Sequence, residues 1–133
     1  MNNEQRELVA YRRERAHESL EEAKILLENG HINTFVNRVY YACFYIVSSL
    51  LLTKELSSAK HSGVRSLFHQ NYVRLGLVDV EMGHVYDKLF DNRQKGDYAD
   101  LVRFESKDVD SWYDEAKEFV VVNGELIEKE LVR

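Results

Sequence analysis

The chain has 133 residues, of which 44% are hydrophobic and 31% charged, and its formal net charge at pH 7 is −5. This balance is typical of one soluble globular domain, over residues 1–133, with a single core, and it excludes a disordered chain. Cys43 is the only cysteine, which excludes an intrachain disulfide and a metal cage built from cysteines.

Two long helices are predicted in the first part of the chain. Apolar residues recur at three- and four-residue steps from Val9 to Leu27, with charged residues on the other face, and Gly30 supplies a stop. Residues 33–54 are apolar over most of a helix circumference, as expected of a central, buried helix.

Further helices are predicted in the second part. Residues 64–75 read as a shorter helix, and Asp79 is a candidate N-cap for a helix over 80–95 that Gly96 ends. The last helix begins near Ser106 and runs close to the C-terminus. Proline is absent and there are only six glycines, which favours long helices over a β fold. We therefore predict an all-α fold, a bundle of five helices.

Location and charge distribution limit the possible partners. No apolar run approaches the roughly 20 residues that span a bilayer, and the N-terminal MNNEQREL has no apolar signal core, so we expect a cytoplasmic protein without membrane contact. The net charge is −2 over residues 1–28, +4 over 29–78 and −7 over 79–133. The middle section either presents a surface suited to phosphate or holds few acids because its helices are buried.

The second predicted helix carries a polar stripe on an otherwise apolar surface. Buried polar groups destabilise a fold unless they are hydrogen-bonded, so the stripe must meet water, a partner chain or other polar groups. It is either a partly exposed face whose tyrosines keep their hydroxyls in water or a homodimer seam and cleft wall. Its members are Thr34, Asn37, Arg38, Tyr41, Tyr45 and Ser48.

Three segments of the chain, NRVYYACFYIVSSLLLTKEL, KHSGVRSLFHQNYV and LFDNRQKGDYADL, together resemble the HEPN domain family of small prokaryotic helical proteins. The resemblance covers roughly residues 8–130. It implies an up-and-down bundle of four to five helices that pairs through its central helices, with a shared polar cleft. Many members of that family are metal-independent ribonucleases that use an arginine followed four to six residues later by a histidine. Others accompany a minimal nucleotidyltransferase in a toxin–antitoxin pair, in which a tyrosine near the arginine receives AMP.

Carried over by residue, the resemblance puts Arg93 at the arginine position and Tyr98 where a ribonuclease has histidine. A tyrosine, with an ordinary pKa near 10, transfers protons poorly at neutral pH. Arg93 remains suited to hold a phosphate, and Asp97 to tether that arginine from one helical turn away. The alternative is a surface pair of Arg93 and Asp97, with Tyr98 packed under the next helix.

The segment RQKGDYAD, residues 93–100, is therefore predicted to be a site. We expect Gly96 to end its helix in a left-handed turn, so that Asp97 and Tyr98 fold back toward Arg93. Tyr98 would then display a hydroxyl able to accept a nucleotidyl group.

Among the histidines, His61 is the best candidate, either as part of an anion site at a helix N-terminus or as a cap. The spacing of Arg12 and His17 is interpreted as a coincidence on a solvated face. No set of His, Asp and Glu has metal-ligand spacing, and neither a metal nor a cofactor is predicted.

Two functions follow. The first is a dimeric module that binds nucleotide or RNA phosphate and is the partner of a minimal nucleotidyltransferase; the second is a metal-independent ribonuclease with an altered residue set. The candidate catalytic residues are Arg93 and Tyr98, the latter also a modification site, and the candidate binding residues are Arg93, Asp97, Asn37, Arg38, Tyr41, His61 and Arg65.

Overall fold

The computed structural model describes residues 1–98 and 101–133, without the side chain of Tyr98. Its helices confirm the all-α prediction. They are α1 (Asn3–Glu28), α2 (Ile32–Leu52), α3 (His61–Phe68), the π-helical turn η1 (His69–Val73), α4 (Val80–Tyr98), α5 (Ser106–Val109) and α6 (Trp112–Leu131).

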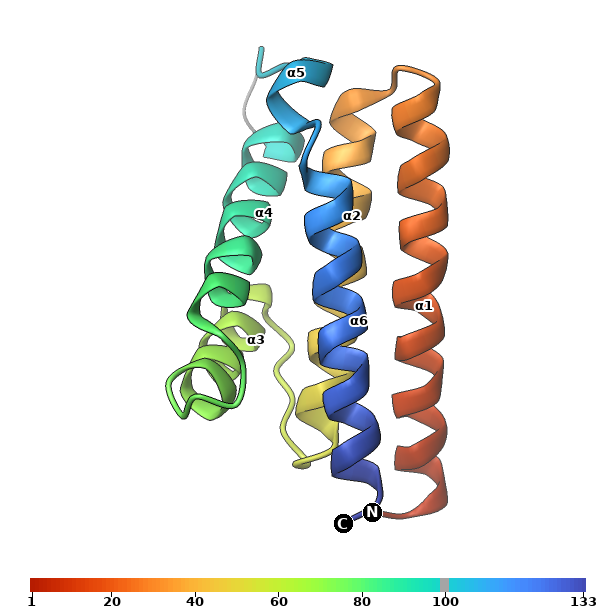
Figure 1. Ribbon diagram of the computed structural model, residues 1–133, viewed down its shortest axis with the longest axis vertical. Helices are drawn as coiled ribbons and strands as arrows, with labels where there is room; N and C mark the ends of the chain where they lie inside the picture. Colours follow the sequence, from red (N-terminus) through yellow and green to blue (C-terminus); the bar gives the residue numbers. More distant parts are fainter. Residues whose placement is uncertain (99–100) are drawn as a thin grey trace.

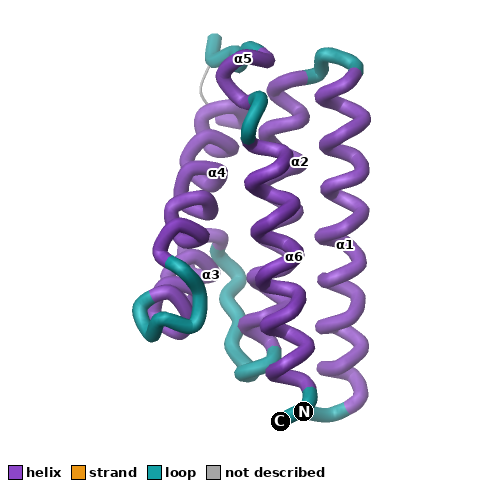
Figure 2. Tube along the Cα trace, viewed as in Figure 1, coloured by secondary structure: helices purple, strands orange, loops and turns teal. Residues whose placement is uncertain are grey.

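The long helices run alternately up and down the bundle (Figure 1). α1 and α2 form an antiparallel pair, α4 runs back up, and α6 returns to the end where both chain termini lie. α3 and η1 occupy the side next to α4, reached by a loop that leaves the lower end of α2 (Figure 2).

α2 is the central element because it packs against α1, α3, α4 and α6. Its side chains reach zero exposure over a wide part of the helix circumference, as at Val39, Tyr40, Ala42 and Cys43. By length and composition, α2 is the one helix of the described chain able to cross a membrane, and 67% of that stretch is buried inside the bundle. A core helix covered on most sides has the same composition as a membrane span, and α2 contains no uninterrupted apolar run of roughly 20 residues.

Two of the predicted stop signals had different outcomes. Gly30 has a φ of +78° just after α1, and this confirms the predicted stop. α4 instead continues through Gly96 to Tyr98, so the predicted left-handed turn was wrong. A Cβ on Gly96 would lie 3.0 Å from Cε2 of Phe104, so the glycine provides room for that ring, and Asp97 continues along the helix.

The other differences concern the shorter elements. The third predicted helix begins at His61, earlier than residue 64, and its second half is π-helical. The last predicted helix is divided into α5 and α6 around Asp110 and Ser111. Neither difference alters the order of the bundle helices.

Candidate functional site

Arg93 lies on α4 and is the one charged residue of the described chain that is buried, with 4% of its surface exposed. Its guanidinium carbon is 4.7 Å from the ring centre of Tyr40 and 5.8 Å from that of Tyr41. Its Nη1 lies 3.6 Å from Oδ2 of Asp97, one helical turn further on. Ring faces and a carboxylate both stabilise a cation removed from water. The tether by Asp97 is confirmed, but the arginine end of this pair is buried, unlike a surface pair.

A chain of polar side chains continues from Asp97 across to α2. Nδ2 of Asn37 donates to Oδ2 of Asp97 at 2.9 Å, and Oδ1 of Asn37 accepts from Nε and Nη2 of Arg38 at 3.0 and 2.8 Å. The guanidinium of Arg38 also lies 4.9 Å from the ring centre of Tyr41 and 3.5 Å from a carboxylate oxygen of Glu22 on α1. Asn37 thus uses both ends of its amide to connect α4 with α2.

His61, the first residue of α3, faces the same cluster. Its Nδ1 lies 2.6 Å from the hydroxyl of Tyr40, and its ring stacks on Phe44 with 4.4 Å between the ring centres. Burial, and next the positive charge of Arg93, lower the pKa of His61 below its usual 6.5. Burial raises the pKa of Tyr40 to about 12. At neutral pH, therefore, both groups are uncharged and Arg93 supplies the positive charge.

Arg65 lies one turn after His61 but has other partners. Its Nη1 is 3.4 Å from Oδ1 of Asp91 and 3.9 Å from Oδ1 of Asp87, and its guanidinium carbon lies 4.0 Å from the ring centre of Phe90. Phe90 in turn meets the ring of Tyr40 edge-on. Arg65 is therefore connected to the Arg93 cluster through an aromatic ring.

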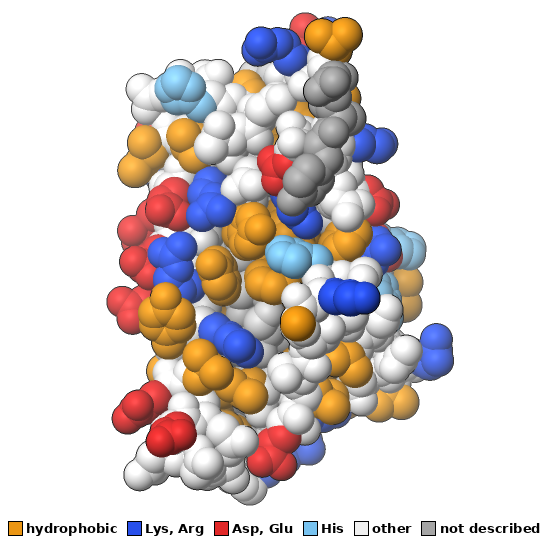
Figure 3. Space-filling model, turned by 180° about the vertical axis from the view of Figure 1, so that it is seen from behind, with side chains coloured by type: hydrophobic (Ala, Val, Ile, Leu, Met, Phe, Trp, Pro, Cys, Tyr) orange, Lys and Arg blue, Asp and Glu red, His pale blue; other side chains and the backbone are white. Residues whose placement is uncertain are grey.

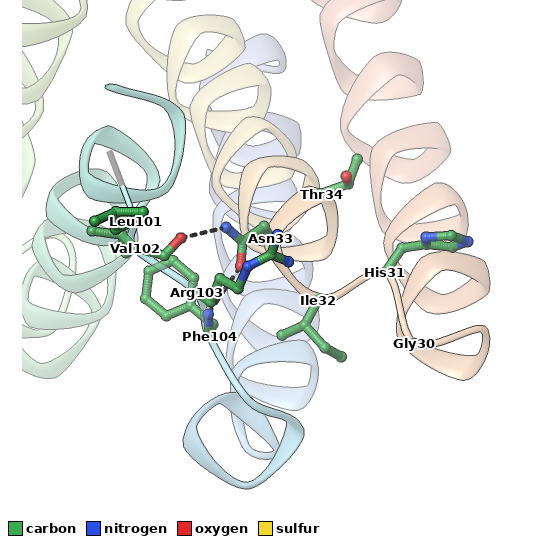
Figure 4. Close-up of a pocket in the computed structure, with 9 residues that line it drawn as sticks. All are labelled: Gly30, His31, Ile32, Asn33, Thr34, Leu101, Val102, Arg103 and Phe104. Carbon is green, nitrogen blue, oxygen red and sulfur yellow. Dashed lines mark hydrogen bonds between the residues drawn. The ribbon is translucent and has the colours of Figure 1, made fainter. Parts of the chain in front are cut away.

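Two open depressions flank the cluster at the upper end of α2. One, of about 520 Å³, is lined by Asn33, Thr34, Asn37, Gly96 and Asp97. The other, of about 480 Å³, is shown in Figure 4 and is lined by residues 30–34 and 101–104. Asn33 fixes the wall of this second depression that residues 101–104 form. Its side chain donates to the carbonyl of Val102 and accepts from the amide of Phe104, both at 2.9 Å.

In the single chain the predicted polar stripe is partly exposed, which both of its interpretations allow. Thr34 is exposed, four members are half-buried and Ser48 is buried. Viewed from behind, hydrophobic side chains gather around a histidine in the middle of the molecule, with Lys and Arg side chains to both sides (Figure 3). This face therefore combines hydrophobic side chains with Lys and Arg side chains.

Comparisons with known proteins show the family of this chain. The model of the HEPN domain matches residues 9–126. The chain belongs to the HEPN family. A UPF0332 protein of Thermotoga maritima is 45% identical over 126 residues, which are 95% of this chain and 96% of that protein. Two proteins of Methanocaldococcus jannaschii are named "Putative toxin MJ0605" and "Putative toxin MJ0142". They are 38% and 33% identical, over 74% and 73% of this chain and 74% and 66% of their own lengths.

The structure of this HEPN chain brings most predicted site residues together. Arg93, Asp97, Asn37, Arg38, Tyr41 and His61 form one cluster, and Arg65 lies beside it. Tyr98 ends α4, and its side chain lies outside the described structure. His17 is exposed, as expected, but Arg12 is half-buried and donates to the carbonyl of Ser48, so the solvated-face interpretation was wrong for Arg12.

Sequence reasoning missed Tyr40 and Phe44. Both lie within the segment that carries the family resemblance, but neither was assigned a role in the site, and Tyr40 is fully buried. The doubled tyrosine at 40 and 41 was the available signal, because a fully buried tyrosine requires a partner for its hydroxyl. No group of three or more potential metal ligands occurs among the residues described.

Proposed function

We propose that this HEPN protein binds RNA or nucleotide phosphate at the Arg93 cluster, as a homodimer, and that it is the partner of a minimal nucleotidyltransferase in a toxin–antitoxin-like pair. The observation that carries the proposal is the position of Arg93. Its charge is removed from water against two adjoining tyrosine rings, yet the half-exposed Asn37, Arg38 and His61 border it. The names of the two relatives called toxins support the same direction.

The physical argument rests on electrostatics. Charges in a partly dry environment act over longer distances than charges in water. Arg93 therefore contributes positive potential at the edge of the cluster, which Asp97 offsets in part, while Arg38 and His61, which are accessible, supply N–H donors to a phosphate oxygen. A neutral His61 still donates one hydrogen bond. Phosphate is the ligand that such a set of nitrogen donors fits best.

Binding is tested with a labelled single-stranded RNA and with ATP, by fluorescence anisotropy over a series of salt concentrations. A variant with alanine at His61, Arg65 and Arg93 should bind weakly, and its salt dependence should be flatter by roughly one unit of slope for each phosphate that the protein no longer touches. The matched control replaces three exposed cations on α1 and α6, Lys24, Lys117 and Lys129. If both triple variants bind RNA and ATP with equal affinity, the cluster has only a structural role.

The nucleotidyltransferase proposal rests on the resemblance of residues 93–98 to the family segment that receives AMP. In that reaction the Tyr98 oxygen attacks the α-phosphorus of ATP, pyrophosphate leaves, and the hydroxyl proton passes to a base of the partner enzyme. Magnesium and ATP are supplied with that enzyme. The test mixes this chain with a nucleotidyltransferase encoded beside it and with ATP, and we expect mass spectrometry to find one AMP on Tyr98. A Tyr98→Phe variant should remain unmodified.

A second function, metal-independent ribonuclease action, is favoured by one observation, the position of His61 beside Arg93. A histidine from α3 would there replace the one missing from the 93–98 segment. Incubation of the purified chain with total RNA and EDTA tests it, beside Arg93→Ala and His61→Ala. RNA cleavage that both substitutions abolish, together with an unmodified Tyr98, would make the ribonuclease the better assignment.

A further inference from the structure

Arg12 lines a small pocket that is separate from the Arg93 cluster. The pocket has a volume of about 170 Å³ and lies where α1, the lower half of α2, the following loop and α3 meet. Its lining is Arg12, Phe44, Tyr45, Ser48, Leu51, Leu56, Ser57, Ser58 and Val64. One side of Phe44 stacks on His61, so this ring divides the pocket from the Arg93 cluster.

The guanidinium of Arg12 is partly removed from water, and it is held by a backbone carbonyl rather than a carboxylate. Its Nη1 donates a hydrogen bond to the carbonyl of Ser48 at 3.3 Å. Burial lowers the pKa of Arg12, and within the described structure no acidic group opposes that effect. The neighbours at three and four residues along α1 are Leu8, Val9, Arg15 and Ala16, none of which is acidic.

The acids near this part of the chain have other partners. Glu55, the one acidic residue between 29 and 78, accepts a hydrogen bond from Gln5. Glu18 pairs with Arg15. A cation partly removed from water is costly unless an anion or further acceptors compensate it. The guanidinium of Arg12 is therefore suited to pair with an anionic group of a ligand or of a partner protein.

The rest of the lining sets the size and polarity of that anion. Val64 and Leu51 are 3% and 1% exposed and form an apolar floor, while serine hydroxyls and Tyr45 form the rim. The volume of about 170 Å³ suits a small ligand. A phosphate would desolvate poorly against hydrocarbon, whereas a carboxylate on a short branched chain would place its oxygens at Arg12 and its methyl groups on the floor.

The wall formed by the loop is held in position before any ligand binds. Oγ of Ser58 accepts from the amide of Lys60 at 3.2 Å. A Cβ on Gly63 would lie 2.1 Å from that oxygen, so the loop is packed as tightly on α3 as a glycine permits. A pocket already formed requires little conformational change on binding.

We propose that this pocket binds a carboxylate carried on a compact apolar group, with Arg12 as the residue that pairs with the carboxylate. Such a group is offered by a free branched-chain acid or by the C-terminal residue of a partner polypeptide. The shared chemistry is one carboxylate beside one small hydrocarbon body. This inference does not require nucleotide or RNA binding at the Arg93 cluster, but Tyr45 and Ser48 belong both to this pocket and to the polar stripe proposed as the dimer seam.

The test is NMR titration of the ¹⁵N-labelled full chain with isovalerate, with isovaleramide as the uncharged probe. We expect saturable shifts of the Ser57 and Ser58 amides with isovalerate at concentrations of about 1–10 mM, the range for a ligand of this size. Isovaleramide should bind at least tenfold more weakly, because it cannot form the charge-assisted hydrogen bond. A short peptide that ends in leucine, free or amidated, distinguishes a partner's C-terminus from a free acid.

Two variants assign the binding to Arg12. Arg12→Gln should weaken isovalerate binding about tenfold or more, whereas Arg13→Gln, which removes a neighbouring arginine that pairs with Glu128, should leave it unchanged. Ser57→Trp, at an exposed rim position, blocks the pocket without touching Arg12. Equal binding by the acid and the amide, equal binding by Arg12→Gln, or no binding of any probe would overturn the proposal.

Discussion

At the scale of single residues, several side chains of the site make two different contacts, one with each end of the side chain. The buried ring of Tyr40 lies under the guanidinium of Arg93, while its hydroxyl bonds His61. Asn37 likewise donates to Asp97 and accepts from Arg38. A substitution that keeps the shape and removes one polar end therefore tests each interaction separately.

Tyr40→Phe removes the hydroxyl and keeps the ring. We expect the free energy of unfolding to fall by about 0.5–1.5 kcal/mol, the net value of one hydrogen bond, in urea denaturation at neutral pH. The control is Tyr11→Phe, at a position that is 57% exposed, which should leave stability unchanged. If the two variants are equally stable, the bond to His61 contributes nothing to the fold.

His61 should make stability depend on pH. Because its pKa is lowered in the folded chain, the unfolded chain binds the proton first. The contribution is therefore fully present above the unfolded pKa of about 6.5 and is lost as the pH falls toward the folded pKa. Urea midpoints between about pH 7 and pH 5 should decline more steeply in the wild type than in His61→Phe, which keeps a ring stacked on Phe44. Parallel profiles would contradict the lowered pKa.

At the scale of elements, repeated patterns predicted more than single residues did. The apolar periodicity of α1 and the nearly continuous apolar surface of α2 predicted both helices, because burial against neighbours determines them. Gly96 did not end α4, since helix propensity is a weak preference that tertiary contacts override, and here Phe104 packs against the glycine. The side chain of Asn33 bonds residues 69 and 71 positions away, which no local pattern indicates.

The contact between Ser58, in the loop before α3, and Gly63, in α3, offers a test at the scale of elements. Gly63→Ala places a Cβ against Oγ and Cβ of Ser58, at 2.1 and 2.8 Å, and should destabilise the fold by about 1–3 kcal/mol, the usual cost of overpacking. Adding Ser58→Gly removes both atoms and should restore a part of that loss. Thermal denaturation of the two single variants and the double variant gives the coupling free energy. Purely additive effects would show that the two residues do not interact.

At the scale of the whole molecule, one face collects tyrosines and arginines while the net charge is negative. Tyr41 and Tyr45 are half-buried, and the guanidinium carbons of Arg38 and Arg15 lie 4.9 and 5.3 Å from their ring centres. Tyrosine and arginine are enriched where proteins associate. An interface built from them is therefore a physical reason to expect a homodimer.

Light scattering at micromolar concentration should give twice the chain mass of 15.6 kDa. Tyr45→Glu should shift the protein toward the monomer, because a two-fold interface brings the same face of both chains together and a new charge on it is repeated. Val121→Glu, at a 46% exposed position on α6, is the matched control and should remain dimeric. A wild-type protein of 15.6 kDa alone would exclude this assembly.

The hydrogen bond between Asn37 and Asp97 joins residues 60 positions apart, and this separation has a consequence during synthesis. While the chain is being translated, α1 and α2 can pair as a local hairpin, but the residues from α4 that complete the cluster have not yet left the ribosome. A nascent chain that stops short of residue 93 therefore carries the tyrosines without the arginine. The cluster forms only when α4 packs against α2, and unfinished chains lack it.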